Sequence, residues 1–121
     1  FRDWRVLVIG GRAVAAMIRH GTGWITNVGQ GARCEGTTID GELGAMAEAA
    51  AKAVGADIAG VDILRDVDGA PFVLEVNSMP SWEGLQSVSP INLGQEIADY
   101  FLARLTAADR RGAAGPLAET G

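Results

Sequence analysis

The segment IAGVDILRDVDGAPFVLEVN, residues 58–77, carries the clearest structural pattern in the chain. Two runs of apolar and β-branched residues flank the pair Asp68-Gly69, and this arrangement is a strong short-range indication of a β-hairpin. If Asp68-Gly69 forms a two-residue turn, Val67 pairs with Ala70. The segment therefore predicts two antiparallel strands whose register follows by counting back from the turn.

Three oxygen-bearing side chains share one face of this predicted hairpin. Counting back places Asp62 directly opposite Glu75, and Asn77 points to the same side because it lies two residues beyond Glu75. Gly60, opposite Asn77, leaves space above the sheet. Carboxylates with Cβ atoms about 5 Å apart repel each other, and a hard cation such as Mg²⁺ relieves this through carboxylate and amide oxygens. The pattern predicts Asp62, Glu75 and Asn77 as metal ligands.

A plainer interpretation of the same hairpin stays open. Asp62 and Glu75 can be solvated side chains on an exposed face, and a bulge or a longer turn would shift the register and separate them. The alternate residues Phe72, Leu74 and Val76 are apolar and are expected to face the core.

A second hairpin is predicted before residue 20, with Gly10-Gly11 between two strand-like runs. A three-residue loop puts Asp3 opposite Arg19 with Arg5 beside them, whereas a two-residue loop puts Arg5 and Arg19 on opposite faces. The sequence leaves both alternatives open. Guanidinium groups suit phosphate or carboxylate, and arginines beside metal carboxylates are what phosphoryl transfer requires. For any single arginine, a plain surface role is equally well supported by composition.

The remaining elements follow from periodicity and turn residues. Asp40 is placed to cap a helix whose apolar stripe begins at Leu43, and Gly55 is placed to end it. Residues 29–39 and 77–90 are rich in glycine or polar residues and are predicted as loops. The predicted strands are 4–9, 14–19, 24–28, 58–67 and 71–76, and a closing helix spans 93–105. This order predicts an α+β fold with a mainly antiparallel sheet and packed helices, in a domain of residues 1–106 followed by a flexible tail of 107–121.

Composition excludes several classes of function. The 121 residues suit one compact domain, and 15 acidic against 10 basic residues argue against nucleic acid as the main partner. The sequence contains no run of ~20 apolar residues that would span a membrane. The single cysteine, Cys34, forms no internal disulfide and fits a reducing, cytoplasmic setting. The chain begins at Phe1 rather than Met, and we expect it to be a piece of a longer protein.

Known catalytic and nucleotide motifs are scarce. The sequence contains neither a Walker-type Gly-x-x-x-x-Gly-Lys-Ser/Thr motif nor a Gly-x-Gly-x-x-Gly fingerprint. It also lacks Gly-x-Ser-x-Gly, and His20 is the single histidine available to a nucleophile. The sequence therefore gives no support for a Ser-His or Cys-His nucleophile, and a surface or hairpin-end role is favoured for His20.

The chain resembles the C-terminal half of the RimK-type ATP-grasp enzymes, the α-L-glutamate ligase family. The matching stretches are DWRVLVIG (residues 3–10), AAMIR (15–19), TNV (26–28), AGVDIL (59–64) and LEVNSMP (74–80), which together cover roughly residues 3–105. After Asn77 the family commonly has Pro-Gly-x-Glu-Gly, whereas this chain has Met79-Pro80-Ser81-Trp82-Glu83-Gly84-Leu85-Gln86. That variant resembles members that act in pterin-type cofactor biosynthesis.

The resemblance implies a fold, a reaction and a set of site residues. It implies the C-terminal lobe of an ATP-grasp fold, with ATP bound against an N-terminal lobe that precedes Phe1. Asp62, Glu75 and Asn77 would bind two Mg²⁺ or Mn²⁺ ions. Arg19 would contact phosphate and Arg5 either phosphate or the acyl substrate, both as catalytic groups. Cofactor-binding residues would be Arg19, Asn27, Asp62 and Glu75.

Three hypotheses follow for the function. The first is an ATP-dependent carboxylate–amine ligase that adds an amino acid such as L-glutamate to a protein or pterin-type carboxylate acceptor through an acyl phosphate, with this chain inactive by itself. The second is a non-catalytic metal- or nucleotide-binding module of the same fold. The third is a small structural domain with solvated carboxylates, which predicts no response to divalent metal. Homo-oligomerisation stays open in all three.

Overall fold

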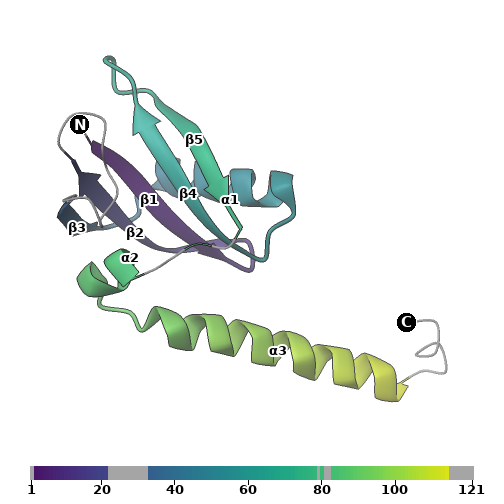
Figure 1. Ribbon diagram of the computed structural model, residues 1–121. Helices are drawn as coiled ribbons and strands as arrows, with labels where there is room; N and C mark the ends of the chain where they lie inside the picture. The colour runs from purple at the N-terminus through teal and green to yellow at the C-terminus, as the bar shows by residue number, and fades with distance from the viewer. Residues whose placement is uncertain (1, 22–32, 79, 81–82, 115–121) are drawn as a thin grey trace.

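The computed structural model describes residues 2–21, 33–78, 80 and 83–114. Within them, a five-stranded antiparallel sheet has the strand order β3-β2-β1-β4-β5. Helix α1 covers one face of the sheet, and α2 and α3 lie on the other (Figure 1). This confirms the predicted α+β class. The elements are β1 (Arg2–Ile9), β2 (Arg12–His20), β3 (Arg33–Thr37), α1 (Gly41–Val54), β4 (Ile58–Arg65), β5 (Pro71–Asn77), α2 (Glu83–Val88) and α3 (Leu93–Ala114).

The β1–β2 hairpin combines a two-residue turn with a bulge. Gly10 and Gly11 have φ angles of 59° and 82°, as a type I′ turn requires, and glycine adopts them without a Cβ penalty. Ile9 pairs with Arg12, but the register shifts by one residue at Val14. Beyond this bulge the pairing is the one that a three-residue loop would give, so Asp3 lies opposite Arg19.

The β4–β5 hairpin combines a longer turn with a bulge. The Asp66 amide donates to the Ala70 carbonyl at 2.9 Å, so the loop holds three residues rather than the predicted two. Gly69 takes the left-handed conformation that such loops need, with φ 85°. A second register shift, at Leu74, restores the predicted alignment, and Asp62 pairs with Glu75.

The bulge also changes which apolar residues of β5 face the core. Phe72 and Leu74 were expected to point inward, but they are 45% and 55% exposed. Val73 packs against the core instead, together with Val76. The extra residue in the strand reverses the alternation on its turn side, which is the expected effect of a one-residue slip.

Helix α1 is bounded as its sequence predicts. The Asp40 carboxylate accepts a hydrogen bond from the Leu43 amide at 2.7 Å, and Gly55 ends the helix with φ 70°. The buried side of α1 packs on residues that alternate along β1 and β4. The central members of this first core are Trp4, Val6, Val8, Leu43, Ala47, Ala51, Ala59, Val61 and Ile63.

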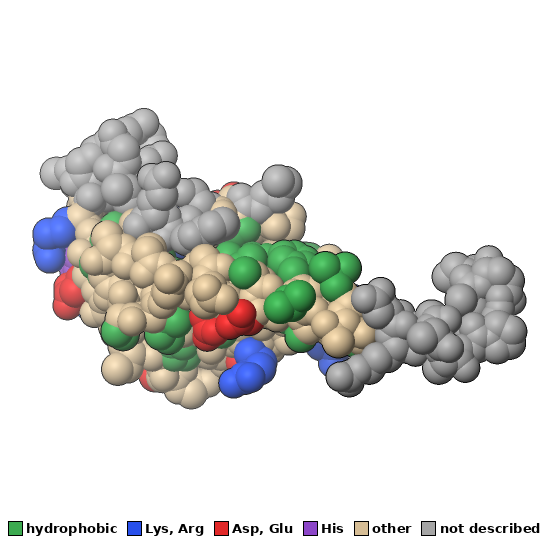
Figure 2. Space-filling view, turned by 90° about the horizontal axis from the view of Figure 1, so that it is seen from below, with side chains coloured by type: hydrophobic (Ala, Val, Ile, Leu, Met, Phe, Trp, Pro, Cys, Tyr) green, Lys and Arg blue, Asp and Glu red, His purple; other side chains and the backbone are tan. Residues whose placement is uncertain are grey.

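The opposite face carries a second, smaller core. Leu7 and Met17 of the sheet pack against Leu85 of α2 and Leu93 of α3. The Gly10 turn fits beneath α3, since a Cβ on Gly10 would lie 2.4 Å from the Tyr100 ring. Past this contact α3 extends beyond the sheet (Figure 1). Exposed apolar side chains gather on this side of the molecule (Figure 2), and those of α3 are Phe101, Leu102 and Leu105.

Three further expectations from the sequence were wrong. Residues 33–37 form β3 although a loop was expected, because pairing with β2 outweighs a composition poor in strand formers. Gly36 fits there because a Cβ would lie 2.4 Å from the Val88 carbonyl oxygen. Residues 83–88 form α2 within the expected loop of 77–90, anchored by the buried Leu85. Helix α3 continues to Ala114, past the predicted end at 105.

Other expectations lie outside the described residues. These are the short strand 24–28, the glycine-rich stretch up to residue 32 and the last part of the predicted tail, 115–121. The boundary between a domain of 1–106 and a flexible tail stays a prediction. In the described ranges, none of the helices combines the length and the apolar character needed to cross a bilayer.

Candidate functional site

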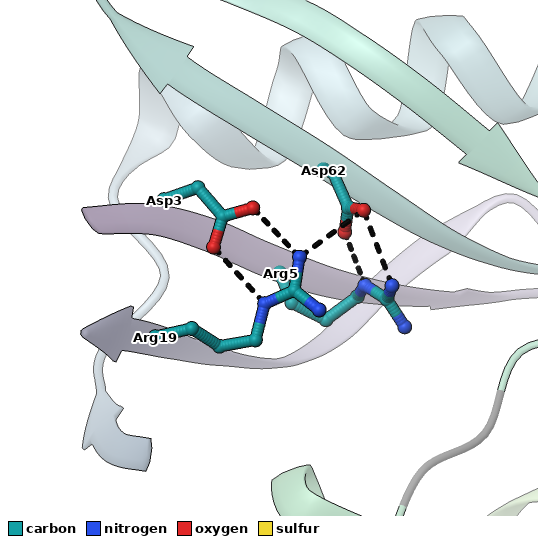
Figure 3. Close-up of polar contacts among 4 residues, drawn as sticks. All are labelled: Asp3, Arg5, Arg19 and Asp62. Carbon is teal, nitrogen blue, oxygen red and sulfur yellow. Dashed lines mark hydrogen bonds and ion pairs between the residues drawn. The ribbon is translucent and has the colours of Figure 1, made fainter. Parts of the chain in front are cut away.

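Four charged side chains meet on the sheet face that α2 and α3 share, and we call them the charged cluster: Asp3, Arg5, Arg19 and Asp62 (Figure 3). Strand alternation places Asp3 and Arg5 on the same side of β1. Arg19 is directly opposite Asp3 on β2, and Asp62 is directly opposite Arg5 on β4. The residues of the cluster therefore come from three neighbouring strands, β2, β1 and β4.

Alternating charges are linked by short contacts through the cluster. Arg19 holds Asp3 with two parallel hydrogen bonds, Nε to Oδ1 at 3.0 Å and Nη2 to Oδ2 at 2.6 Å. Arg5 donates two hydrogen bonds to Asp62 in the same manner, from Nε to Oδ1 and from Nη2 to Oδ2 at 3.2 Å. The Nη2 of Arg19 also lies 3.1 Å from Oδ2 of Asp62. Arg19 thus lies between the two aspartates (Figure 3).

The cluster is largely removed from water. Asp3 and Asp62 are 1% and 4% exposed, and the arginine side chains are only slightly more accessible. Burial alone would lower the pKa of Arg19, but the hydrogen bond to Asp3 and the charges of Asp62 and Asp3 outweigh it and raise the pKa of this guanidinium. Arg19 therefore stays charged at any ordinary pH.

Glu75 and Asn77 border the cluster on β5. Glu75 pairs with Asp62 and Asn77 with Gly60, as the sequence predicted. Glu75 is exposed, and within the described part of the chain it makes no hydrogen bond or ion pair. Asn77 is half-buried and has a polar partner.

The oxygens of Asp62 and Glu75 suit a hard divalent cation, but few of those on Asp62 are available to it. A carboxylate offers about four lone-pair sites, and Asp62 uses three of them on Arg5 and Arg19. One site on Oδ1 is left for a monodentate bond, while Glu75 keeps both oxygens. The described residues contain no group of three acidic, His or Cys side chains that could hold a metal, so an amide oxygen has to complete a set based on Asp62 and Glu75.

Formal charge favours a cation next to the cluster. Two arginines balance two aspartates within it, so the four residues are neutral together. Glu75 then adds one uncompensated negative charge directly beside Asp62. A divalent ion between Asp62 and Glu75 would make the whole site positive, which suits a polyphosphate.

Sequence reasoning missed two parts of this arrangement. Asp3 was considered only as a neighbour of Arg19, although its spacing from Arg5 already puts the two on one face. The open space expected above Gly60 is filled, because the Arg5 side chain and Pro80 lie over it. Asn27, predicted to bind cofactor, lies outside the described residues.

A pocket among the described residues lies away from the cluster. It has a volume of about 660 Å³ and is lined by the opposite end of β2, by the end of β3 and by the segment after α2. Its walls are mostly small apolar and hydroxyl-bearing residues, including Val14, Thr37, Val88 and Ile91. None of the charged cluster lines it, so the chemistry and the pocket are separate features of the surface.

Comparison with known proteins identifies close relatives of the sequence. Residues 1–101 match the family described as the RimK-like ATP-grasp domain. The chain is 43% identical over 102 residues to the tetrahydromethanopterin:alpha-L-glutamate ligase of Methanococcus maripaludis, covering 84% of this chain and 35% of that protein. It is 39% identical over 106 residues to a probable alpha-L-glutamate ligase of Rhodopirellula baltica, covering 86% and 26%. The chain thus spans about a third or less of the length of these curated relatives.

Solved structures agree with the sequence comparison. The ATP-grasp ligase PsnB complexed with a minimal precursor aligns with a TM-score of 0.71 at 26% identity, covering 86% of this chain and 35% of PsnB. PsnB complexed with the precursor, Mg and ADP aligns with a TM-score of 0.68 at 27% identity, covering 84% and 31%. The predicted ATP-grasp architecture is confirmed for this part of the fold.

Proposed function

The chain belongs to the RimK-like ATP-grasp family, and we propose that it is the metal- and phosphate-binding part of an ATP-dependent carboxylate–amine ligase. The observation that carries the proposal is the placement of Asp62 and Glu75 directly opposite each other, beside two half-buried arginines. The metal- and ADP-containing complex of PsnB, a relative by fold, supports it.

Each residue of the site has a role in this proposal. Asp62, Glu75 and Asn77 hold two Mg²⁺ or Mn²⁺ ions, whose charge draws phosphate oxygens to the site. Arg19 contacts phosphate, and because its pKa is raised it remains a cation throughout the reaction. Arg5 contacts phosphate or the acyl substrate. Asp3 keeps Arg19 oriented through its two parallel hydrogen bonds.

The proposed reaction needs positioning and charge rather than an enzyme nucleophile. A substrate carboxylate attacks the terminal phosphate of ATP, which gives an acyl phosphate and ADP. The amine of an amino acid such as L-glutamate then attacks the acyl carbon, phosphate leaves, and an amide bond forms. Arginines that neutralise the transferred phosphate lower the barrier electrostatically.

The acceptor and the cellular setting are further parts of the proposal. The Methanococcus maripaludis relative is named a tetrahydromethanopterin:alpha-L-glutamate ligase, and we infer a pterin-type or protein carboxylate acceptor for this chain. An N-terminal lobe of the same protein supplies the rest of the ATP site, so the 121 residues alone are expected to be inactive. We infer a cytoplasmic location, where ATP is available and Cys34 stays reduced.

A metal titration tests the site. Mg²⁺ and Mn²⁺, with ADP present, are added to the parent chain and to an Asp62→Asn/Glu75→Gln variant while thermal unfolding is followed. A rise in Tm confined to the parent supports the proposed site, since a ligand of the folded state stabilises it. The matched control, Asp68→Asn/Glu96→Gln, removes two charges elsewhere and should keep the rise. Equal shifts in all three chains would contradict the assignment of the ligands.

An activity assay tests the reaction. The parent protein that contains this chain together with its N-terminal lobe should release ADP over many turnovers only when an amino acid and a carboxylate acceptor are both present, because the amine is needed to consume the acyl phosphate. Metal-dependent binding without any such turnover would favour a non-catalytic module. Amide-forming ATP turnover by the isolated 121 residues would overturn the expectation that they are inactive alone.

A further inference from the structure

We propose that Gly60 is a positioning residue for the candidate site, because its missing side chain is the clearance that lets Arg5 and Pro80 lie together over β4. The role of Arg5 in this inference rests on the proposed function, whereas the close contacts around Gly60 do not depend on it. Gly60 occupies the centre of the sheet, opposite Leu7 on β1 and Asn77 on β5.

Gly60 is explained by the space that it leaves for neighbouring side chains and not by its backbone conformation. Gly60 has the ordinary extended backbone of β4, unlike the turn and cap glycines, which have positive φ. A Cβ built on Gly60 would lie 2.9 Å from Cβ of Pro80, 3.0 Å from Nη1 of Arg5 and 3.2 Å from Cδ of Arg5. Glycine weakens a strand interior, so its presence at this point indicates a close approach by other groups.

Both neighbours of Gly60 have little freedom to move aside. Pro80 is buried and its ring is rigid. Arg5 is fixed from the other side by its two contacts with Asp62. An added methyl group must therefore displace Pro80 from the sheet or pull Arg5 away from Asp62, and the second outcome would leave Asp62 with Arg19 as its one remaining cation within the cluster.

The arrangement joins two functional parts of the molecule. Pro80 lies three residues after Asn77, so it belongs to the segment that follows the proposed metal ligands. Arg5 belongs to the charged cluster. Because both lie against Gly60, the position of Pro80 and the orientation of the Arg5 guanidinium depend on the same clearance.

The test compares three glycine-to-alanine variants of the chain by NMR of the arginine Nε–H groups. Gly60→Ala adds its methyl group beside Arg5. Gly36→Ala collides with the Val88 carbonyl and has no contact with Arg5, and Gly41→Ala points into open space. We expect hydrogen exchange of the Arg5 Nε–H to speed up in Gly60→Ala alone, by a factor between about two and one hundred, as for residues in direct contact.

Two results would overturn the proposal. One is an unchanged Arg5 Nε–H signal in folded Gly60→Ala, and the other is an equal change in Gly36→Ala, which would reveal a general loosening. If Gly60→Ala does not fold, the Gly60→Ala/Arg5→Ala double variant is compared with Arg5→Ala alone, because loss of Arg5 also removes a partner of Asp62. Recovery of folding in the double variant supports the clash, whereas a double variant that fails to fold where Arg5→Ala folds refutes a role through Arg5.

A second measurement separates this proposal from the proposed function. Mn²⁺ binding with ADP present is measured for the same variants, and Gly60→Ala should weaken it while Gly41→Ala should not. Absence of binding in the parent chain as well would count against the proposed metal site and would leave the NMR result on Gly60 to be judged by itself.

Discussion

The two faces of the five-stranded sheet are built from alternate residues of the same strands, yet they differ in kind. On β1, Trp4, Val6 and Val8 pack beneath α1 in a continuous apolar core. Asp3 and Arg5 point the other way, into the charged cluster. One stretch of six residues, 3–8, therefore supplies stability on one side and the candidate chemistry on the other.

The second face is itself divided along the strands. Toward the Gly10 turn, Leu7 and Ile9 are covered by α2 and α3 in the smaller core. Toward the start of β1, the same face carries the charged cluster in place of apolar side chains. Buried ion pairs contribute little net stability, because removing the charges from water costs free energy. The α1 face therefore supplies most of the apolar packing that stabilises the fold, while half of the opposite face is occupied by the charged cluster.

The largest effect is expected when one charge is removed from the cluster. Asp62→Ala would leave Arg5 and Arg19 without a shared carboxylate in a buried site, and we expect the free energy of unfolding to fall by about 3–5 kcal/mol. Urea denaturation measures it. The loss should not change with pH near neutrality. The pKa of Arg19 is raised in the folded chain, so the stability that its charge contributes is fully present at neutral pH and is lost only as the pH rises through that pKa in strongly alkaline solution.

Asp62→Asn keeps the shape of the side chain and serves as the companion variant if Asp62→Ala does not fold. It should lose less stability than Asp62→Ala, since the amide oxygen still accepts one hydrogen bond. Losses below about 1 kcal/mol in both variants, the level of a surface ion pair, would contradict a buried cluster.

Replacing both members of an ion pair should not lower the free energy of unfolding, in contrast to removing one charge. Asp3→Leu/Arg19→Met substitutes apolar side chains of similar size for a buried pair, and such exchanges leave stability unchanged or raise it by up to about 4 kcal/mol. Thermal and urea unfolding measure the change, and Asp3→Leu alone is the control that should destabilise the chain. A double variant as unstable as that control would show that this face is kept for stability after all.

The α1 face should respond to truncation through packing alone. Val61→Ala changes the residue next to Asp62 that points to the other side, where Val61 is fully buried. Loss of two methyl groups and the resulting cavity should cost about 2 kcal/mol. Mn²⁺ binding in the presence of ADP, measured where the variant is folded, should stay the same. Weakened binding would show that the two faces are coupled.

The sequence predicts several elements well, but not how the register arises. The strand at 4–9 and the helix cap at Asp40 follow from local features, and both were confirmed. The two hairpins were harder, because each combines a turn of one length with a bulge that shifts the register back or forward. Bulges at Val14 and Leu74 depend on packing across the sheet, which no local pattern in the sequence specifies.

Two further features also arise only in three dimensions. Strand β3 forms because β2 offers it a partner, and its five residues contain little that favours a strand. The Arg5–Asp62 contact joins residues 57 positions apart. The opposition of Asp62 and Glu75 was predicted correctly although the turn was predicted one residue too short, because the bulge at Leu74 compensates for it.

The smallest effect tests that opposition directly. Glu75→Gln removes an exposed carboxylate facing Asp62, and without metal we expect a gain of about 0.2–1 kcal/mol from relieved repulsion, shrinking as salt screens it. With Mn²⁺ and ADP the order should reverse, because the parent gains stability from binding and the variant loses a ligand. Thermal unfolding in EDTA and in Mn²⁺–ADP measures both arms, with Asp68→Asn at the far end of the same hairpin as control. A Glu75→Gln chain less stable than the parent in EDTA would mean that Glu75 stabilises the fold, and its place beside Asp62 would then need no metal to explain it.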